Sequence, residues 1–164
     1  MSPTALAWVG LDTVSVRRPD DAETVTSFGL PSVEPPSVGA VSDDGRFVAV
    51  SFFHHDEVAI WDVDRRALVF QRELFGSYLD SVELHGTVLD LGFSQDGAKL
   101  LASVKLNMPS ENPVQVIDVQ SGAVSPVVPF GVSASFLSFD VDWTADGRIL
   151  VGAWSGSISQ LVEP

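Results

Sequence analysis

The sequence predicts an all-β protein in which about four antiparallel sheets, each of four strands, stack side by side. Short runs rich in Val, Ile, Phe and Trp recur along the 164 residues, and each run has the length of a strand. Polar turns containing glycine separate the runs, and the same order of runs and turns repeats. No stretch shows the apolar period of a helix.

The clearest unit runs from Ala40 to Glu73. A first run ends at Ser42, and three further runs follow at 46–53, 57–63 and 67–73. Short polar connections join them, which predicts a complete antiparallel sheet. Such a sheet cannot bury both of its faces alone, so similar sheets must stack beside it.

The remaining runs predict three more sheets of the same kind. Before the complete unit we expect strands at 5–10, 13–18 and 23–30, which align with its last three strands. After it we expect strands at 87–94, 99–105, 113–119, 123–130, 138–144, 148–153 and 157–162. The sheets of this single domain therefore occupy about 1–30, 38–73, 87–130 and 137–164. The first lacks its inner strand and the last lacks its outer strand.

A repeated turn is the strongest internal evidence. It reads Ser42-Asp43-Asp44-Gly45, then Ser94-Gln95-Asp96-Gly97, then Thr144-Ala145-Asp146-Gly147. The three glycines lie 52 and 50 residues apart, close to the length of about 40–50 residues that one blade of a β-propeller occupies. Each Asp-Gly pair lies between two expected strands, where a hairpin turn needs a residue that accepts positive φ. The sequence therefore predicts a β-propeller.

Two motifs allow a family comparison. The segment Phe93-Ser94-Gln95-Asp96-Gly97 and the pair Trp61-Asp62 resemble the repeat pattern of WD-repeat β-propellers and of the related YVTN-type bacterial propellers. The resemblance covers nearly the whole chain. It is divergent, because Ile117-Asp118 and Gln160-Leu161 stand where other units would carry Trp-Asp.

The resemblance also implies a hydrogen-bonded network within a blade. In WD-repeat blades a His, a Ser or Thr, an Asp and the Trp form this network. Ser51, Asp56 and Trp61 match three of these roles, whereas no His lies near Val38. His85 precedes the third unit near the place where such blades carry a His, so we expect it to form structural hydrogen bonds.

The number of strands bears on how the ring closes. Closed propellers commonly have more than four blades, and joined ends remove exposed sheet edges. The chain is therefore either a piece of a longer propeller or one of two chains that complete a ring. In the second case we expect a homodimer, or an association with another chain, through the incomplete first and last units.

Composition excludes several classes of partner. The sequence has nine basic and 22 acidic residues, which gives a formal net charge of −13. Such a charge repels phosphate backbones and anionic lipid. We expect neither nucleic acid nor a membrane as partner. The acidity suits a salty cytoplasm or an Arg-favouring genome, and both explanations stay open.

The sequence also limits cofactors and targeting. The chain has no cysteine, so it has no disulfide and no thiolate metal site. No phosphate loop or dinucleotide fingerprint appears, and we expect no cofactor. Residues 1–10 lack the pattern of a secretory signal or a membrane span. We therefore expect a cytoplasmic protein.

The resemblance implies a binding face. In propellers, the loops that join successive sheets and those that join second to third strands share one face of the disk. Here this face carries His54, His55, Asp56, Glu57, Tyr78, Asp80, His85, Asn107, Met108, Glu111 and Trp154. It suits a protein or peptide partner of basic charge, so we expect a non-enzymatic scaffold. Residues 54–57 alone are most simply a solvated hairpin loop, because neighbouring strand residues point to opposite faces.

Two other functions stay open. One is a propeller hydrolase or lactonase, with a metal-assisted site in the central channel. It would use Asp90, Asp140 or Asp142 with His85 or His54. The other is a dimerisation or cap module of a larger enzyme.

Overall fold

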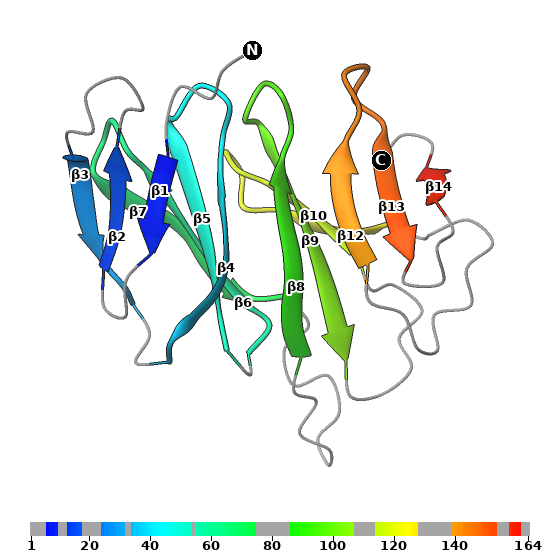
Figure 1. Cartoon of the computed structure of the whole chain (residues 1–164), viewed down its shortest axis with the longest axis horizontal. Helices are drawn as coiled ribbons and strands as arrows, with labels where there is room; N and C mark the ends of the chain where they lie inside the picture. Colours follow the sequence, from blue (N-terminus) through cyan, green and yellow to red (C-terminus); the bar gives the residue numbers. More distant parts are fainter. Residues whose placement is uncertain are drawn as a thin grey trace.

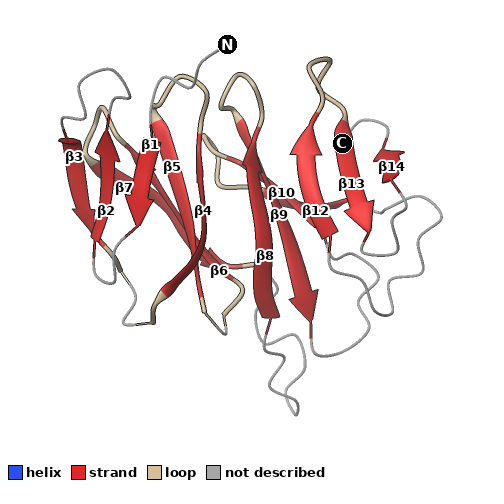
Figure 2. Ribbon diagram, viewed as in Figure 1, coloured by secondary structure: helices blue, strands red, loops and turns tan. Residues whose placement is uncertain are grey.

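Four antiparallel sheets stand side by side in the computed structural model (Figures 1 and 2). The structure describes residues 6–9, 13–17, 24–31, 34–53, 55–74, 86–106, 114–127, 139–153 and 158–161. All regular secondary structure in these ranges is strand. In this part of the chain no helix is long and apolar enough to cross a membrane.

Each sheet consists of strands that follow one another in the chain, and we call it a blade. Blade 1 contains β1 (Leu6–Val9), β2 (Thr13–Arg17) and β3 (Thr24–Gly29). Blade 2 contains β4 (Pro36–Val41), β5 (Phe47–Phe52), β6 (Glu57–Asp62) and β7 (Ala67–Glu73). Blade 3 contains β8 (Gly86–Phe93), β9 (Lys99–Leu106), β10 (Val114–Asp118) and β11 (Val124–Val127). Blade 4 contains β12 (Phe139–Trp143), β13 (Ile149–Ala153) and β14 (Ile158–Leu161).

The predicted fold class is confirmed. Within the described ranges, blades 1 and 4 have three strands and blades 2 and 3 have four. The differences lie at the strand ends and go in both directions: the strand expected at 99–105 extends to Leu106, and others are shorter than expected. The strand expected at 46–53, for example, is Phe47–Phe52.

The first strands of blades 2, 3 and 4 lie next to one another. β4 contacts β8, and β8 contacts β12. Figure 1 shows these strands in front, with β6, β7 and β10 behind them. β5 also contacts β8, and β9 contacts β12, so the second strand of a blade reaches the first strand of the next. β1 contacts β4 in the same way, which supports its assignment as a second strand.

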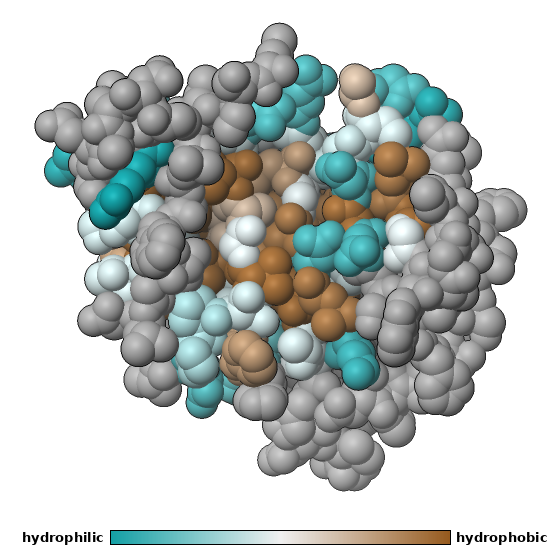
Figure 3. Space-filling view, viewed as in Figure 1, coloured by the Kyte–Doolittle hydropathy of each residue, from teal (hydrophilic) through white to brown (hydrophobic). Residues whose placement is uncertain are grey.

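Three apolar clusters fill the spaces between neighbouring blades. In β5, Val48 and Val50 point toward blade 1, whereas Ala49 between them points toward blade 3. In β9, Leu101 packs toward blade 4 and Leu100 toward blade 2. Blades 2 and 3 are thus covered on both faces, which explains their nearly continuous apolar runs. Figure 3 shows apolar residues gathered over the middle of the face that Figure 1 displays.

The repeated turn is closed by its own side chains. Ser42 Oγ donates to Asp44 Oδ1 at 2.7 Å and accepts from the Phe47 amide at 2.8 Å. Ser94 makes the equivalent bonds to Asp96 and to the Lys99 amide. Gly45, Gly97 and Gly147 adopt φ of 72°, 67° and 81°. The three turns share one geometry because of this bonding. Their glycines adopt the left-handed conformation that other residues rarely adopt.

Replacing Gly97 with alanine is expected to destabilise the protein. Its positive φ disfavours a Cβ, and the added atom would meet Ser42 Cβ at 3.4 Å. We expect Gly97→Ala to lower the free energy of unfolding by about 1–2 kcal/mol, measured by urea denaturation. The control is Gly29→Ala, because that glycine has no positive φ and an added Cβ meets nothing within 4 Å. Equal unfolding midpoints for the two variants would contradict the prediction.

Candidate functional site

The structure describes only part of the predicted loop face. His55, Asp56 and Glu57 lie between β5 and β6 or at the start of β6. The other predicted members lie outside the described residues: His54, Tyr78, Asp80, His85, Asn107, Met108, Glu111 and Trp154. Their assignment to this face stays a prediction.

The described part of this face is an ordered turn. The His55 amide donates to the Phe52 carbonyl at 3.4 Å, and the Leu74 amide donates to the Asp56 carbonyl at 3.1 Å. Glu57 Oε1 accepts a bond of 2.8 Å from Gln71 Nε2 on β7. The Asp56 residue is only 6% exposed, so it differs from the expected solvated loop. His55 and Glu57 remain partly exposed to a partner.

The prediction that Ser51 and Trp61 belong to one WD-type hydrogen-bonded network is wrong. Ser51 lies opposite Val58, and Trp61 lies opposite Val48, so their side chains are on opposite faces of blade 2. Trp61 is 3% exposed and stacks on Phe28 of blade 1 with ring centroids 6.0 Å apart. The pairing register of β6 with β5 decides which face of the sheet the Trp61 side chain takes, and the Trp-Asp motif alone does not reveal that register.

Ser51 has a different structural role. Its Oγ accepts a bond of 3.2 Å from the Val38 amide. Val38 lies in the part of β4 where the pairing with β5 shifts between Pro36 and Gly39. A bulge leaves a backbone group without its ladder partner, and the buried hydroxyl provides a substitute acceptor. Ser51 therefore stabilises the irregular inner strand.

The acidic residues near the inner strands gather where blades 3 and 4 meet. Asp90 Oδ1 accepts from the Leu91 amide at 2.9 Å, and Asp90 Oδ2 accepts from the Val141 amide at 2.8 Å. Asp140 and Asp142 flank Val141 on β12. A depression of about 460 Å³ lies beside them, with Leu150 and Gly152 in its wall. Both oxygens of Asp90 are thus engaged by backbone donors, one of them from the next blade.

A second bond joins the same two blades. Trp143 Nε1 on β12 donates to the Gly92 carbonyl on β8 at 3.0 Å. Together with the Asp90–Val141 bond it fixes β12 against β8. The described residues include no group of three His, Cys, Asp or Glu that could hold a metal ion. The geometry at Asp90 therefore fits a structural link between blades.

The electrostatic environment of Asp90 is unusual. Burial raises the pKa of its carboxyl above the ordinary value of 3.8, and the charges of Asp140 and Asp142 add to this increase. Bonds from the Val141 and Leu91 amides act in the opposite direction. The charged form of Asp90 is therefore less favoured in the folded protein than in the unfolded chain.

Sequence reasoning missed a pocket of about 380 Å³ between blades 2 and 3. It lies at the edge formed by the short turns, whereas the predicted loop face lies at the other ends of the same strands. Its lining residues are Arg46, Phe47, Asp62, Arg65, Val69, Asp96, Gly97, Ala98, Val119 and Gln120. The signal available in the sequence was the placement of two arginines in an acidic chain: Arg46 directly follows one turn, and Arg65 lies within the next.

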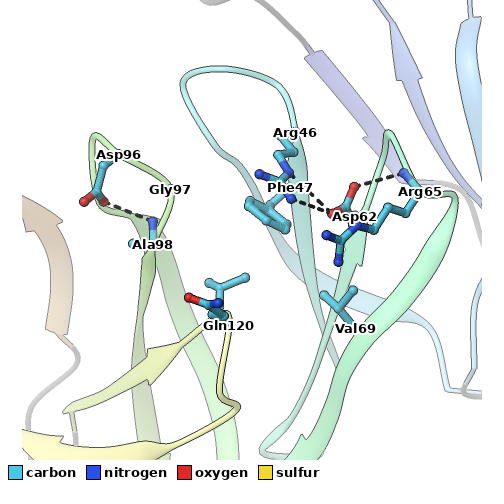
Figure 4. A pocket seen from close by; sticks show the side chains of 10 residues that line it. Arg46, Phe47, Asp62, Arg65, Val69, Asp96, Gly97, Ala98 and Gln120 are labelled. Atoms are coloured by element: carbon cyan, nitrogen blue, oxygen red, sulfur yellow. Dashed lines mark hydrogen bonds and ion pairs between the residues drawn. The ribbon is translucent and has the colours of Figure 1, made fainter.

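Asp62 organises one wall of this pocket (Figure 4). Its side chain is 1% exposed. Oδ1 accepts from the Arg65 amide at 3.0 Å, and Oδ2 accepts from Arg46 Nε and Nη2 at 3.3 and 3.1 Å. Burial acts to raise the pKa of Asp62, but these bonds and the two arginine charges hold it below the ordinary value. Asp62 is therefore a buried anion at neutral pH.

Comparison with solved structures supports the fold. A KlHsv2 variant, in which loop 6CD is replaced by a Gly-Ser linker, matches 93% of this chain and 48% of its own length, with 16% identity and a TM-score of 0.65. The β-propeller domain of Cps50 (Swd1) from Myceliophteria thermophila matches 98% of this chain and 51% of its own length, with 11% identity and a TM-score of 0.68. The chain thus spans about half the length of these structures.

Sequence comparisons add no family assignment. No family model matches the chain, and no curated protein matches its sequence. At these identities the structural likeness establishes the β-propeller fold alone. The resemblance to WD or YVTN repeats has no support from a family model.

Removing the charges beside Asp90 is expected to lower its pKa. We expect the double variant Asp140→Asn, Asp142→Asn to lower the Asp90 pKa toward 3.8, because two like charges are lost. The measurement is an NMR titration of the side-chain carboxyl carbon. Asp64→Asn, at an exposed turn of blade 2, should leave the pKa unchanged.

The sign of the effect on stability follows from the raised pKa. Between 3.8 and the higher folded-state value, the folded protein binds a proton at Asp90 more tightly than the unfolded chain does. The contribution of this carboxyl to the free energy of unfolding therefore falls as pH rises through that interval. A measured Asp90 pKa at or below 3.8 would contradict both statements.

Proposed function

We propose that this chain is a non-enzymatic part of a β-propeller scaffold that binds a basic protein or peptide through the predicted loop face. The observation that carries the proposal is the coverage of blades 2 and 3 on both faces. This packing holds the strand ends in fixed positions, so the points from which the loops start are preorganised. Preorganisation lowers the entropy cost of binding a partner.

Charge supports a basic partner. The formal net charge of −13 produces a field that attracts cations and increases their association rate. On the described part of the loop face, Glu57 presents a partly exposed carboxylate, and Gln71 orients it from β7. Asp56 contributes less, because its burial keeps it from a partner.

We further propose that additional blades complete the ring. The chain matches about half of the length of the two propeller structures described above. Among the described residues, blades 1 and 4 each pack one face against a neighbouring blade. A second copy of the chain, or another chain, would cover their other faces and leave no terminal blade exposed.

Charge reversal at Glu57 is expected to weaken the binding of a basic partner. We expect Glu57→Lys to reduce the affinity for a hexa-arginine peptide by roughly two- to fivefold at low salt, the range of a partly exposed ion pair. Isothermal titration calorimetry gives the affinity. The matched control, Asp64→Lys, makes the same change in net charge at the turn edge. Equal losses in both variants would show that only net charge matters and would remove the loop-face assignment.

Completion of the ring by a second copy predicts a dimer. We expect a mass of twice 17.5 kDa by light scattering on a sizing column, at both low and high salt. A folded monomer that stays monomeric at high concentration would contradict closure by a second copy. The further blades would then come from a longer form of this chain or from another chain.

A further inference from the structure

The pocket between blades 2 and 3 contains an arginine whose guanidinium makes no hydrogen bond to the described part of the chain. Figure 4 shows two walls that face each other. Blade 2 supplies Arg46, Asp62 and Arg65, and blade 3 supplies Ala98 and Gln120. The two turns that form the walls are far apart in sequence and meet only because the blades stack.

Arg46 is committed to the fold. It donates two hydrogen bonds to Oδ2 of Asp62, and its guanidinium lies 4.8 Å from the centre of the Phe47 ring. Because Asp62 is buried, it requires this partner to remain charged. Arg46 therefore compensates Asp62 and forms the inner wall of the pocket.

Arg65 is additional to this pair. Its Nε lies 3.6 Å from Oδ2 of Asp62, which is an ion-pair distance without a hydrogen bond. Within the part of the chain that the structure describes, Arg65 donates a hydrogen bond only from its backbone amide. Its side chain is 71% exposed, so five N–H donors on the guanidinium remain available to a ligand.

The blade 2 wall of the pocket carries one more arginine than carboxylate. Arg46 and Asp62 compensate each other. Asp96 lies on the opposite wall, where bonds from Ser94 and from the Ala98 amide, together with the charge of Lys99, lower its pKa. The charge of Lys99, which does not line the pocket, acts on both Asp96 and Asp118. On the blade 2 wall, two arginines face the single carboxylate of Asp62, which leaves one positive charge in excess there. A single negative charge would match it.

Apolar groups adjoin these charges. Phe47, Val69 and Val119 contribute carbon surface to the lining. Val69 is the extra residue of a bulge, because Trp61 pairs with Leu68 and Ile60 pairs with Phe70. A bulge redirects side chains at a sheet edge. It leaves Val69 and the neighbouring Leu68 exposed, at 38% and 43%.

We propose that this pocket binds a carboxylate carried by an apolar group, as at an acidic or C-terminal position of a partner protein. The guanidinium of Arg65 would take the carboxylate in a bidentate pair, and Phe47, Val69 and Val119 would cover the adjoining carbon atoms. A monoanion matches the one positive charge in excess on the blade 2 wall, whereas the acidic chain would repel a phosphate dianion more strongly. This site is separate from the loop face of the proposed function.

The test uses 3-phenylpropionate as the minimal probe, followed by NMR of the arginine side-chain Nε–H signals. We expect a saturable shift of the Arg65 signal, and of backbone amides in the 62–66 and 119–121 turns, at about 1–10 mM probe. The matched amide, 3-phenylpropionamide, should cause no such shift. Arg65→Gln should weaken binding by roughly tenfold, since it removes a charge-assisted pair.

Arg66→Gln is the matched control, because it makes the same charge change at an exposed neighbour that does not line the pocket. It should bind the probe as the unmodified chain does. Gln120→Glu tests the pocket from blade 3, where the added carboxylate should compete for Arg65 and reduce binding. A missing shift, or equal binding by the Arg65 and Arg66 variants, would overturn the proposal.

Two peptides then distinguish the source of the carboxylate. One ends in Phe with a free carboxylate, and the other has blocked ends and an internal Leu-Glu pair. Preference for the first assigns the pocket to a C-terminus, and preference for the second assigns it to an acidic side chain. Failure of both peptides would overturn the assignment to a protein partner. None of these outcomes depends on Glu57 or on the loop face.

Discussion

The structure depends on the need to cover both faces of an apolar antiparallel sheet. Blades 2 and 3 carry buried residues on both faces, and neither could be stable in water alone. Blades 1 and 3 cover blade 2, and blades 2 and 4 cover blade 3. Each blade therefore stabilises its neighbour, and the stacking brings distant turns together.

The two edges of the blades differ in structure and in the side chains that they carry. At one edge, short turns closed by Ser42, Ser94 and Thr144 hold the hairpins in nearly identical shapes. Differences between blades appear there only where side chains project, as Arg65 does between blades 2 and 3. At the other edge lie His55 and Glu57 and the expected binding loops. The fold thus offers two edges: a turn edge where Arg65 borders a pocket, and a loop edge whose acidic character stays a prediction.

Sequence reasoning reached the fold because its signals are local. A run of apolar residues and an Asp-Gly turn need no distant information, and Gly45, Gly97 and Gly147 marked the repeats correctly. It failed at Trp61, because a shift of one residue in register decides which face a side chain takes. It also missed the pocket, since Arg65 and Gln120 are brought together only by blade stacking. Nothing in the sequence around Asp56 indicated that this residue is buried.

The stack of nearest neighbours also governs how the protein opens. Blades 2 and 3 contact a neighbour on each side, whereas within the described chain blades 1 and 4 contact only one. In a stack of this kind, we expect a blade with one covered face to open more readily than a blade with two, unless a further blade covers its other face. The bonds from Trp143 and Asp90 slow this process at blade 4, because they must break before β12 separates from β8.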